Sequence, residues 1–130
     1  MLNECVVSPE KLNILLVEWI DRLRLQEWNI VVDIYREKDF ICEDSIGENS
    51  FNKSNAKSII RILDPCDYSE NTRFPQNMEK TLVHELLHLK FCYFEPEDEN
   101  SLEHDMWERT IETLAETLVR TKYEQVKREK

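Results

Sequence analysis

His84, Glu85 and His88 form an HExxH pattern inside the apolar run from Thr81 to Leu89. Residues four apart in a helix lie on the same face, one turn apart, so both imidazoles can bind one zinc ion. Glu85 would then lie beside the metal, where its carboxylate can take a proton from metal-bound water. A match of five residues also arises by chance, so the surrounding elements decide whether this chemistry is supported.

A catalytic zinc usually has three protein ligands, and the sequence offers the third one on a later helix. Glu108 lies three residues before Ile111 and seven before Ala115, on the apolar stripe of that helix. A carboxylate directed at the core is costly unless it is paired or binds a metal, which makes Glu108 the preferred ligand. The alternatives are His104, one turn earlier, and another residue or none.

Glu112 lies one turn after Glu108 on the same side of the expected helix. Its carboxylate could accept a hydrogen bond from a zinc-binding imidazole and so fix the tautomer of that ring. Alternatively, Glu108 and Glu112 are boundary residues that pair with Arg109 or Lys53. Possible donors to the oxyanion of a hydrolytic reaction, each of which also suits a structural role, are Tyr93, Tyr68 and Arg73.

Three helices are expected to hold these groups. Ser8 and Pro9 predict the start of the first as N-cap and first helical residue, and it should end between residues 24 and 26. The HExxH helix should run from about residue 76 to residue 94, where Pro96 prevents its continuation. Asn100, with Glu103 in the capping-box position, predicts the start of the last helix.

Strands are expected between the first two helices. Trp28–Tyr35 and Ser58–Leu63 are rich in β-branched and aromatic residues, and a weaker strand is expected near Ile46–Phe51, around Gly47, the only glycine. The order helix, two or three strands, helix, loop, helix predicts one α+β domain over residues 1–130 with a small sheet of two to four strands. A charged, solvated tail is expected from about residue 122 to residue 130.

The composition restricts the partners and the compartment. Lys and Arg number 17 against 27 Asp and Glu, and the net charge of −10 disfavours nucleic acids and anionic membranes. No CxxC pair, no signal-like start and no membrane-length apolar stretch indicate a cytoplasmic protein, which we expect to be a monomer. Cys92, one turn past His88, could approach the metal, but packing is its expected role.

HELLH at 84–88, followed by ERTIE at 108–112 on the next helix, resembles the gluzincin clan of zinc metallopeptidases. The clan's second motif is a glutamate ligand with an acidic residue four positions later. The short layout is similar to the minimal gluzincins and to compact phage and bacterial metallopeptidases, such as the SprT-like group and the peptidases that cleave phage immunity repressors. In the latter an ExxANxFA-type helix provides the third ligand, and ERTIETLA at 108–115 fits that pattern loosely.

The resemblance covers Trp28–Val119 and implies a zincin-like fold with one zinc ion per chain. It implies a metallopeptidase in which Glu85 assists the attack of zinc-bound water on a peptide bond, with a peptide or protein as substrate. Relatives bind substrate as an added strand, here beside Ile46–Phe51 or Ser58–Leu63. Glu112 stands where the clan usually has Asp or Asn, and no downstream His or Tyr matches the clan's oxyanion donor. The alternative functions are an inactive, metal-stabilised regulatory or binding module and an acidic interaction protein without metal.

Overall fold

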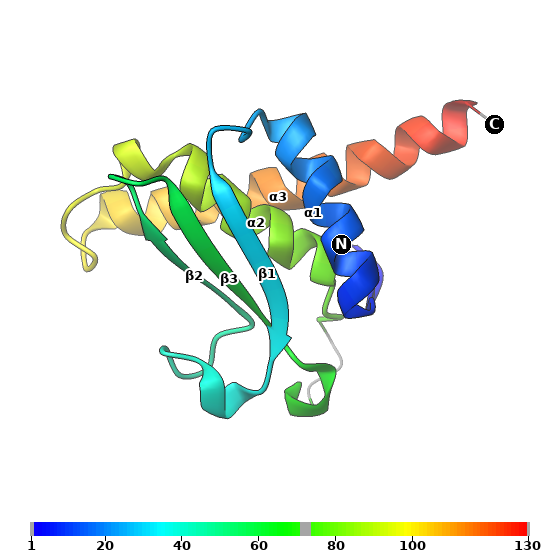
Figure 1. Ribbon diagram of the computed structural model, residues 1–130, viewed down its shortest axis with the longest axis horizontal. Helices are drawn as coiled ribbons and strands as arrows, with labels where there is room; N and C mark the ends of the chain where they lie inside the picture. The colour runs from blue at the N-terminus through cyan, green and yellow to red at the C-terminus, as the bar shows by residue number, and fades with distance from the viewer. Residues whose placement is uncertain (1, 71–73, 130) are drawn as a thin grey trace.

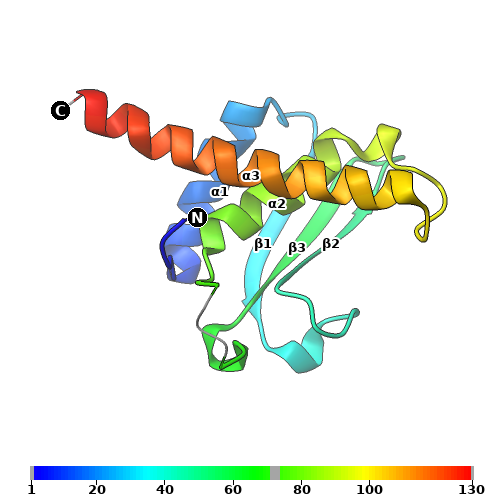
Figure 2. The same cartoon turned by 180° about the vertical axis from the view of Figure 1, so that it is seen from behind.

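The computed structural model describes residues 2–70 and 74–129. Figure 1 shows one β-sheet with three helices on a single face, which confirms the α+β class. Seen from behind in Figure 2, the last helix lies across the HExxH helix, on the side away from the sheet. Within the described residues, no helix is both long enough and apolar enough to cross a membrane.

The sheet contains β1 (Asn29–Tyr35), β2 (Gly47–Asn52) and β3 (Lys57–Leu63) in the order β1-β3-β2. β1 runs parallel to β3, whereas β2 runs antiparallel to it. The three expected strands are therefore confirmed to within about one residue at each end. β3 is the central strand, so β2 and β1 form the two edges of the sheet.

One face of the sheet carries the core. Helix α1 (Pro9–Leu23) begins at Ser8, whose side chain accepts a hydrogen bond from the Lys11 backbone N–H, and its end at Leu23 is close to the expected one. Its apolar stripe packs with the HExxH helix over Val32, Ile60 and Ile62. In residues 2–70 and 74–129 no helix covers the opposite face of the sheet, and the side chains of the register partners Val31 and Ile59 are exposed there (Figure 1).

The HExxH pattern lies on helix α2 (Met78–Lys90), which is capped by the Asn77 side chain. The helix was expected to continue to residue 94. The α-helix instead ends at Lys90 with Phe91 as its C-cap, and a 3₁₀ turn, Cys92–Phe94, follows. Cys92 is buried in the core, as expected for a packing residue.

Helix α3 (Leu102–Glu129) corrects two expectations. Ser101 rather than Asn100 begins it, because the Ser101 hydroxyl oxygen accepts a hydrogen bond from the His104 backbone N–H at 3.1 Å. The helix also continues through the segment expected to be a solvated tail, and Lys122 is buried. Its ammonium group lies 2.6 Å from Oε2 of Glu79, a buried carboxylate of α2. The charged residues of this segment predicted exposure to solvent, but Lys122 forms an internal ion pair instead.

Candidate metal centre

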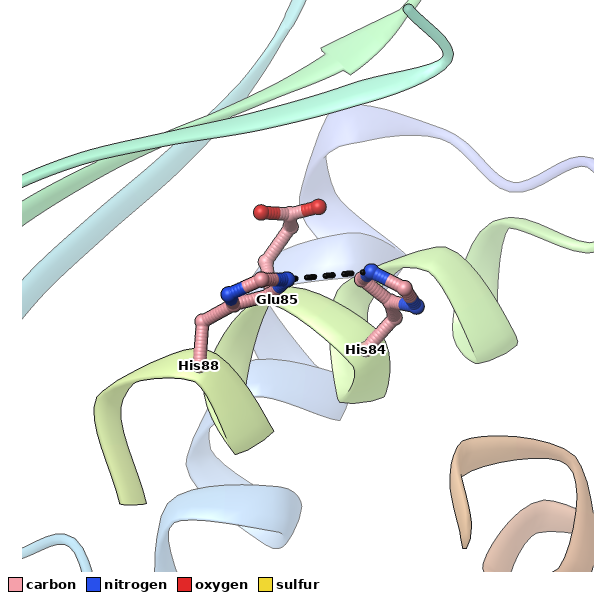
Figure 3. A group of neighbouring side chains, drawn as sticks. All are labelled: His84, Glu85 and His88. Carbon is pink, nitrogen blue, oxygen red and sulfur yellow. Dashed lines mark hydrogen bonds between the residues drawn. The ribbon is translucent and has the colours of Figure 1, made fainter. Parts of the chain in front are cut away.

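His84 and His88 extend from consecutive turns of α2 toward the same point (Figure 3). Their Nε2 atoms are 3.1 Å apart, and both side chains are mostly buried. Two nitrogen ligands at about 2.0–2.1 Å from a tetrahedral zinc would be roughly 3.3 Å apart, so this spacing is close to that of a ligand pair. Within the described residues, the ligand atoms of His84, Glu85 and His88 all lie within 4.8 Å of one another.

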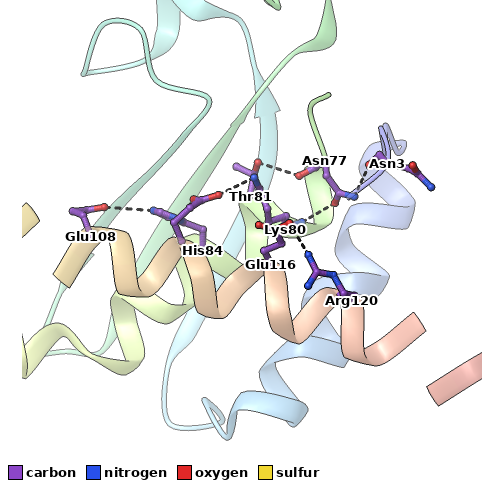
Figure 4. Close-up of polar contacts among 9 residues, drawn as sticks. Asn3, Asn77, Lys80, Thr81, His84, Glu108, Glu116 and Arg120 are labelled. Atoms are coloured by element: carbon purple, nitrogen blue, oxygen red, sulfur yellow. Dashed lines mark hydrogen bonds and ion pairs between the residues drawn. The ribbon is translucent and has the colours of Figure 1, made fainter. Parts of the chain in front are cut away.

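Glu108 reaches the same point from α3. Its Oε2 lies 3.7 Å from Nε2 of His84 (Figure 4). Its Oε1 lies 3.5 Å from Nε2 of His88. The hydrogen bond with His88 lowers the pKa of the Glu108 carboxyl, although partial burial opposes this effect. Two imidazole nitrogens and a carboxylate, from two helices, therefore converge where the sequence predicted a three-residue ligand set.

Glu112 orients one of the two imidazoles. Its Oε2 lies 2.7 Å from Nδ1 of His84, and its Oε1 lies 2.7 Å from the ammonium of Lys80. Mainly because of the hydrogen bond with His84, the pKa of Glu112 falls to about 2, so this carboxylate stays ionised. Burial lowers the pKa of His84, but the hydrogen bond with Glu112 and the nearby carboxylates raise it more, so the pKa is raised. When the ring is neutral, Glu112 favours the tautomer with its proton on Nδ1, which leaves the Nε2 lone pair for a metal. The pairing of Glu112 with Arg109 or Lys53 is not what the structure shows, since Glu112 pairs with Lys80.

Glu85 lies between the histidine pair and the sheet, with its carboxylate directed toward the strands (Figure 3). The residue is only 7% exposed, and its burial raises the pKa of the carboxyl despite the nearby imidazoles. Among the residues that the structure describes, none donates a hydrogen bond to this carboxylate. Glu85 instead lines two cavities, of about 240 and 370 Å³, that lie between α2 and the chain around β2.

Gly47 allows β2 to pass close to this carboxylate. A Cβ atom at position 47 would lie 2.5 Å from Cγ2 of Thr81 and 3.2 Å from Oε2 of Glu85. The only glycine of the chain therefore stands where a strand meets the HExxH helix at short range. Glycine inside a strand is a known sign of such an approach, and this signal was present in the sequence.

His104 lies outside the converging group. Its Nε2 is 3.3 Å from Glu95, and its ring packs against Trp107 at a centroid distance of 5.4 Å. Trp107 also packs against the His88 ring at a centroid distance of 5.0 Å, so its indole contacts the rings of both His104 and His88. The structure thus brings Glu108, and not His104, to the histidine pair.

Of the expected oxyanion donors, Tyr93 and Tyr68 do not line the two cavities beside Glu85. Tyr93 is 71% exposed, and the Lys53 ammonium lies 5.2 Å from the centre of its ring. Tyr68 follows the 3₁₀ turn Pro65–Asp67, and burial, aided by the charge of Glu4 near the N-terminus, raises its pKa to about 12. Arg73 lies outside the described residues.

Comparison with models of protein families, with curated proteins and with solved structures found no match. The chemistry open to the site follows from its own geometry. That geometry combines a His/His/Glu donor set, a carboxylate that orients one imidazole, and a buried glutamate that faces two cavities.

Proposed function

We propose that this protein is a zinc-dependent metallopeptidase of zincin-like fold. The observation that carries the proposal is Glu85, which is only 7% exposed, lines two cavities, and lies beside two converging imidazoles. Burial raises the pKa of its carboxyl group, although the charges of the two imidazoles oppose this effect. A carboxylate kept in that state next to a metal-binding pair suits a general base.

The donor set fits zinc. His84 and His88 offer two nitrogens 3.1 Å apart, and the two carboxylate oxygens of Glu108 lie 3.7 Å from the first nitrogen and 3.5 Å from the second. Glu112 orients one of the two imidazoles. Three protein ligands that leave a further position free are typical of catalytic zinc. When bound, zinc would act as a Lewis acid that lowers the pKa of a water molecule and polarises a carbonyl group.

Glu85 moves the proton of the proposed reaction. Its carboxylate takes a proton from the water whose oxygen attacks the carbonyl carbon of the peptide bond. As the C–N bond breaks, Glu85 delivers that proton to the amine nitrogen, so the carboxylate is regenerated in each cycle. Because burial raises its pKa, Glu85 accepts a proton more readily near neutral pH than an exposed glutamate does.

The sheet offers one edge beside the site for a peptide. Of the two strands considered for this role, β3 is central and paired on both sides, whereas β2 is an edge strand. β2 and the residues just before it also line both cavities that Glu85 faces. A substrate added as an extended strand along β2 would place a peptide bond next to Glu85.

The test uses Glu85→Gln, which keeps the shape of the side chain and removes its basicity. Both the wild-type protein and this variant should contain about one zinc ion per chain by elemental analysis. Cleavage of a peptide library should fall by about 10²–10⁴-fold in the variant. Glu103→Gln, at an exposed position of α3, is the matched control and should behave as wild type.

The outcomes separate the candidate functions. A zinc-free wild type would contradict both metal-dependent functions. A zinc-containing wild type that cleaves no peptide would favour the metal-stabilised binding module. Equal cleavage by wild type and Glu85→Gln would show that the reaction does not use Glu85 as a base.

A further inference from the structure

We infer that Asn49 is a positioning residue that holds the edge strand β2 against the backbone of Glu85 and thereby sets the width of the substrate cleft. The inference rests on the proposed function, because the cleft matters only if a peptide lies along β2. Asn49 is neither a metal ligand nor a base. Its effect on the reaction would pass through the position of the strand.

The contacts of Asn49 cross from the sheet to the helix. Its Nδ2 donates a hydrogen bond to the backbone carbonyl oxygen of Glu85 at 3.0 Å. That carbonyl lies in the middle of α2, and a carbonyl oxygen has a second lone pair free for such a bond. This hydrogen bond therefore links the edge strand β2 to helix α2 at Glu85, the residue whose carboxylate is the proposed base.

Ser58 fixes the orientation of the Asn49 amide. The Ser58 hydroxyl donates to Oδ1 of Asn49 at 2.6 Å, and Ser58 is buried on the central strand β3. Because the Glu85 carbonyl can only accept, the amide nitrogen must face it, and Oδ1 is left to accept from Ser58. Reversing the amide would break the hydrogen bond to the Glu85 carbonyl and set two acceptor oxygens against each other, although the Ser58 hydroxyl could then accept from Nδ2. The chain Ser58–Asn49–Glu85 thus has one satisfied arrangement.

The hydrogen bond also lies next to a short approach of strand and helix. Two residues before Asn49, on the same face of β2, Gly47 leaves no room for a Cβ against Thr81 and Glu85. Gly47 permits the short distance, and Asn49 supplies an attraction that maintains it. Asn49 and Gly47 both line the larger cavity together with Glu85 and the two histidines. A displacement of β2 would therefore widen the cleft at the reacting end of the site.

The experiment compares Asn49→Asp with Ser50→Ala. Asn49→Asp has nearly the same shape but replaces the donor with an oxygen that repels the Glu85 carbonyl. Ser50 lies on the opposite face of β2, where its hydroxyl oxygen accepts a hydrogen bond from Arg61 of β3. Ser50→Ala removes this bond and leaves the contact of Asn49 with α2 intact. Zinc content, peptide cleavage, global stability and amide hydrogen exchange of residues 47–52 are measured for each.

In Asn49→Asp we expect the KM for a peptide substrate to rise about tenfold, as for the loss of one well-placed hydrogen bond, with zinc content unchanged. Exchange of the protected β2 amides should accelerate by about tenfold, while exchange of the α1 amides stays as in wild type. Ser50→Ala should match wild type in KM. Ser58→Ala, which leaves the Asn49 amide free to rotate, should show a smaller change in the same direction and serves if Asn49→Asp does not fold.

A KM and a β2 exchange rate within about twofold of wild type in Asn49→Asp would overturn the inference. Loss of zinc in Asn49→Asp, or an equal effect of Ser50→Ala, would also overturn it, because Asn49 would then act on the metal site or on the strand in general. If the wild type cleaves no peptide, the proposed function fails. Hydrogen exchange would still decide whether Asn49 holds β2 on the helix.

Discussion

The Glu112 carboxylate bridges the Lys80 ammonium and the His84 imidazole of the proposed metal centre, and each of its two oxygens lies 2.7 Å from its partner. Lys80 and Glu112 together keep the His84 ring in one orientation and one tautomer. Glu112→Ala should therefore lower zinc affinity by about 10–100-fold, without removing a ligand. Competition with a chromophoric chelator measures this affinity. Glu103→Ala, at an exposed position of the same helix, should bind zinc as tightly as wild type, and equal binding by Glu112→Ala would refute the orienting role.

Gly47 is required because of space and not because of backbone conformation. Its φ is not positive, so alanine could adopt the same backbone, but its Cβ would collide with Cγ2 of Thr81. Gly47→Ala should lower the free energy of unfolding by about 1–3 kcal/mol, as overpacking does. Thr81→Ser removes the colliding methyl group and keeps the hydroxyl bond to the Asn77 carbonyl.

A double-mutant cycle tests this steric cause by denaturant unfolding. The cost of Gly47→Ala should be smaller when residue 81 is serine than when it is threonine. Additive effects of the two substitutions would mean that the collision with Thr81 is not the source of the cost.

At the scale of whole elements, a buried carboxylate fastens α3 to the other two helices. Glu79 of α2 accepts hydrogen bonds from the indole N–H of Trp19 on α1 and from Lys122 and Tyr123 on α3. Lys122 also lies 2.9 Å from Glu18 of α1. This cluster holds one end of the helix that carries Glu108, so the last residues of α3 contribute to the placement of a ligand near its beginning.

The cluster predicts a loss of stability in alkali. Burial and the Glu79 hydrogen bond raise the pKa of Tyr123 to about 12, against 10 for a free tyrosine. Burial lowers the pKa of Lys122, but its hydrogen bonds with Glu79 and Glu18 raise it more, so the pKa of this residue is raised as well. Between pH 10 and about 12 the unfolded chain loses these protons before the folded chain does, so stability falls as pH rises.

Tyr123→Phe tests this assignment, because phenylalanine cannot ionise. Unfolding free energy measured by denaturant from pH 9 to 12 should fall less steeply in the variant than in wild type, even if the variant starts lower at neutral pH. Identical slopes would show that Tyr123 does not contribute to the pH dependence. Tyr93→Phe, at an exposed tyrosine, is the matched control and should keep the wild-type slope.

Local patterns predicted most of the elements, and tertiary contacts explain what they missed. Ser8 and Pro9, and the β-branched and aromatic residues of Trp28–Tyr35, act over a few residues, so the first helix and the first strand were predictable. The role of Lys122 was not, because it depends on a carboxylate 43 residues away. Likewise, the converging His/His/Glu group could be expected from helical spacing, whereas the contact of Asn49 with Glu85 depends on how sheet and helix pack.

At the scale of the whole molecule, the core and the proposed metal centre are separate. The buried side chains that join the sheet, α1 and α2 include Leu12, Trp19, Ile60 and Leu82, none of which lines the cavities beside Glu85. The side chains of the proposed metal centre, His84, His88 and Glu108, instead line the larger of these two cavities. The fold therefore does not require the metal to close its core, unlike small domains that unfold when zinc is removed.

Zinc should consequently stabilise a protein that is already folded. Wild type treated with a chelator should unfold cooperatively, and zinc at 100 times its dissociation constant should raise the free energy of unfolding by about 2.7 kcal/mol. Thermal unfolding at increasing free zinc measures this dependence. His84→Ala should unfold cooperatively too but respond little to zinc, since it lacks a ligand. Unfolding of the wild type by chelator alone would mean that the metal is part of the fold, and a zinc response equal to wild type in His84→Ala would place the metal elsewhere in the chain.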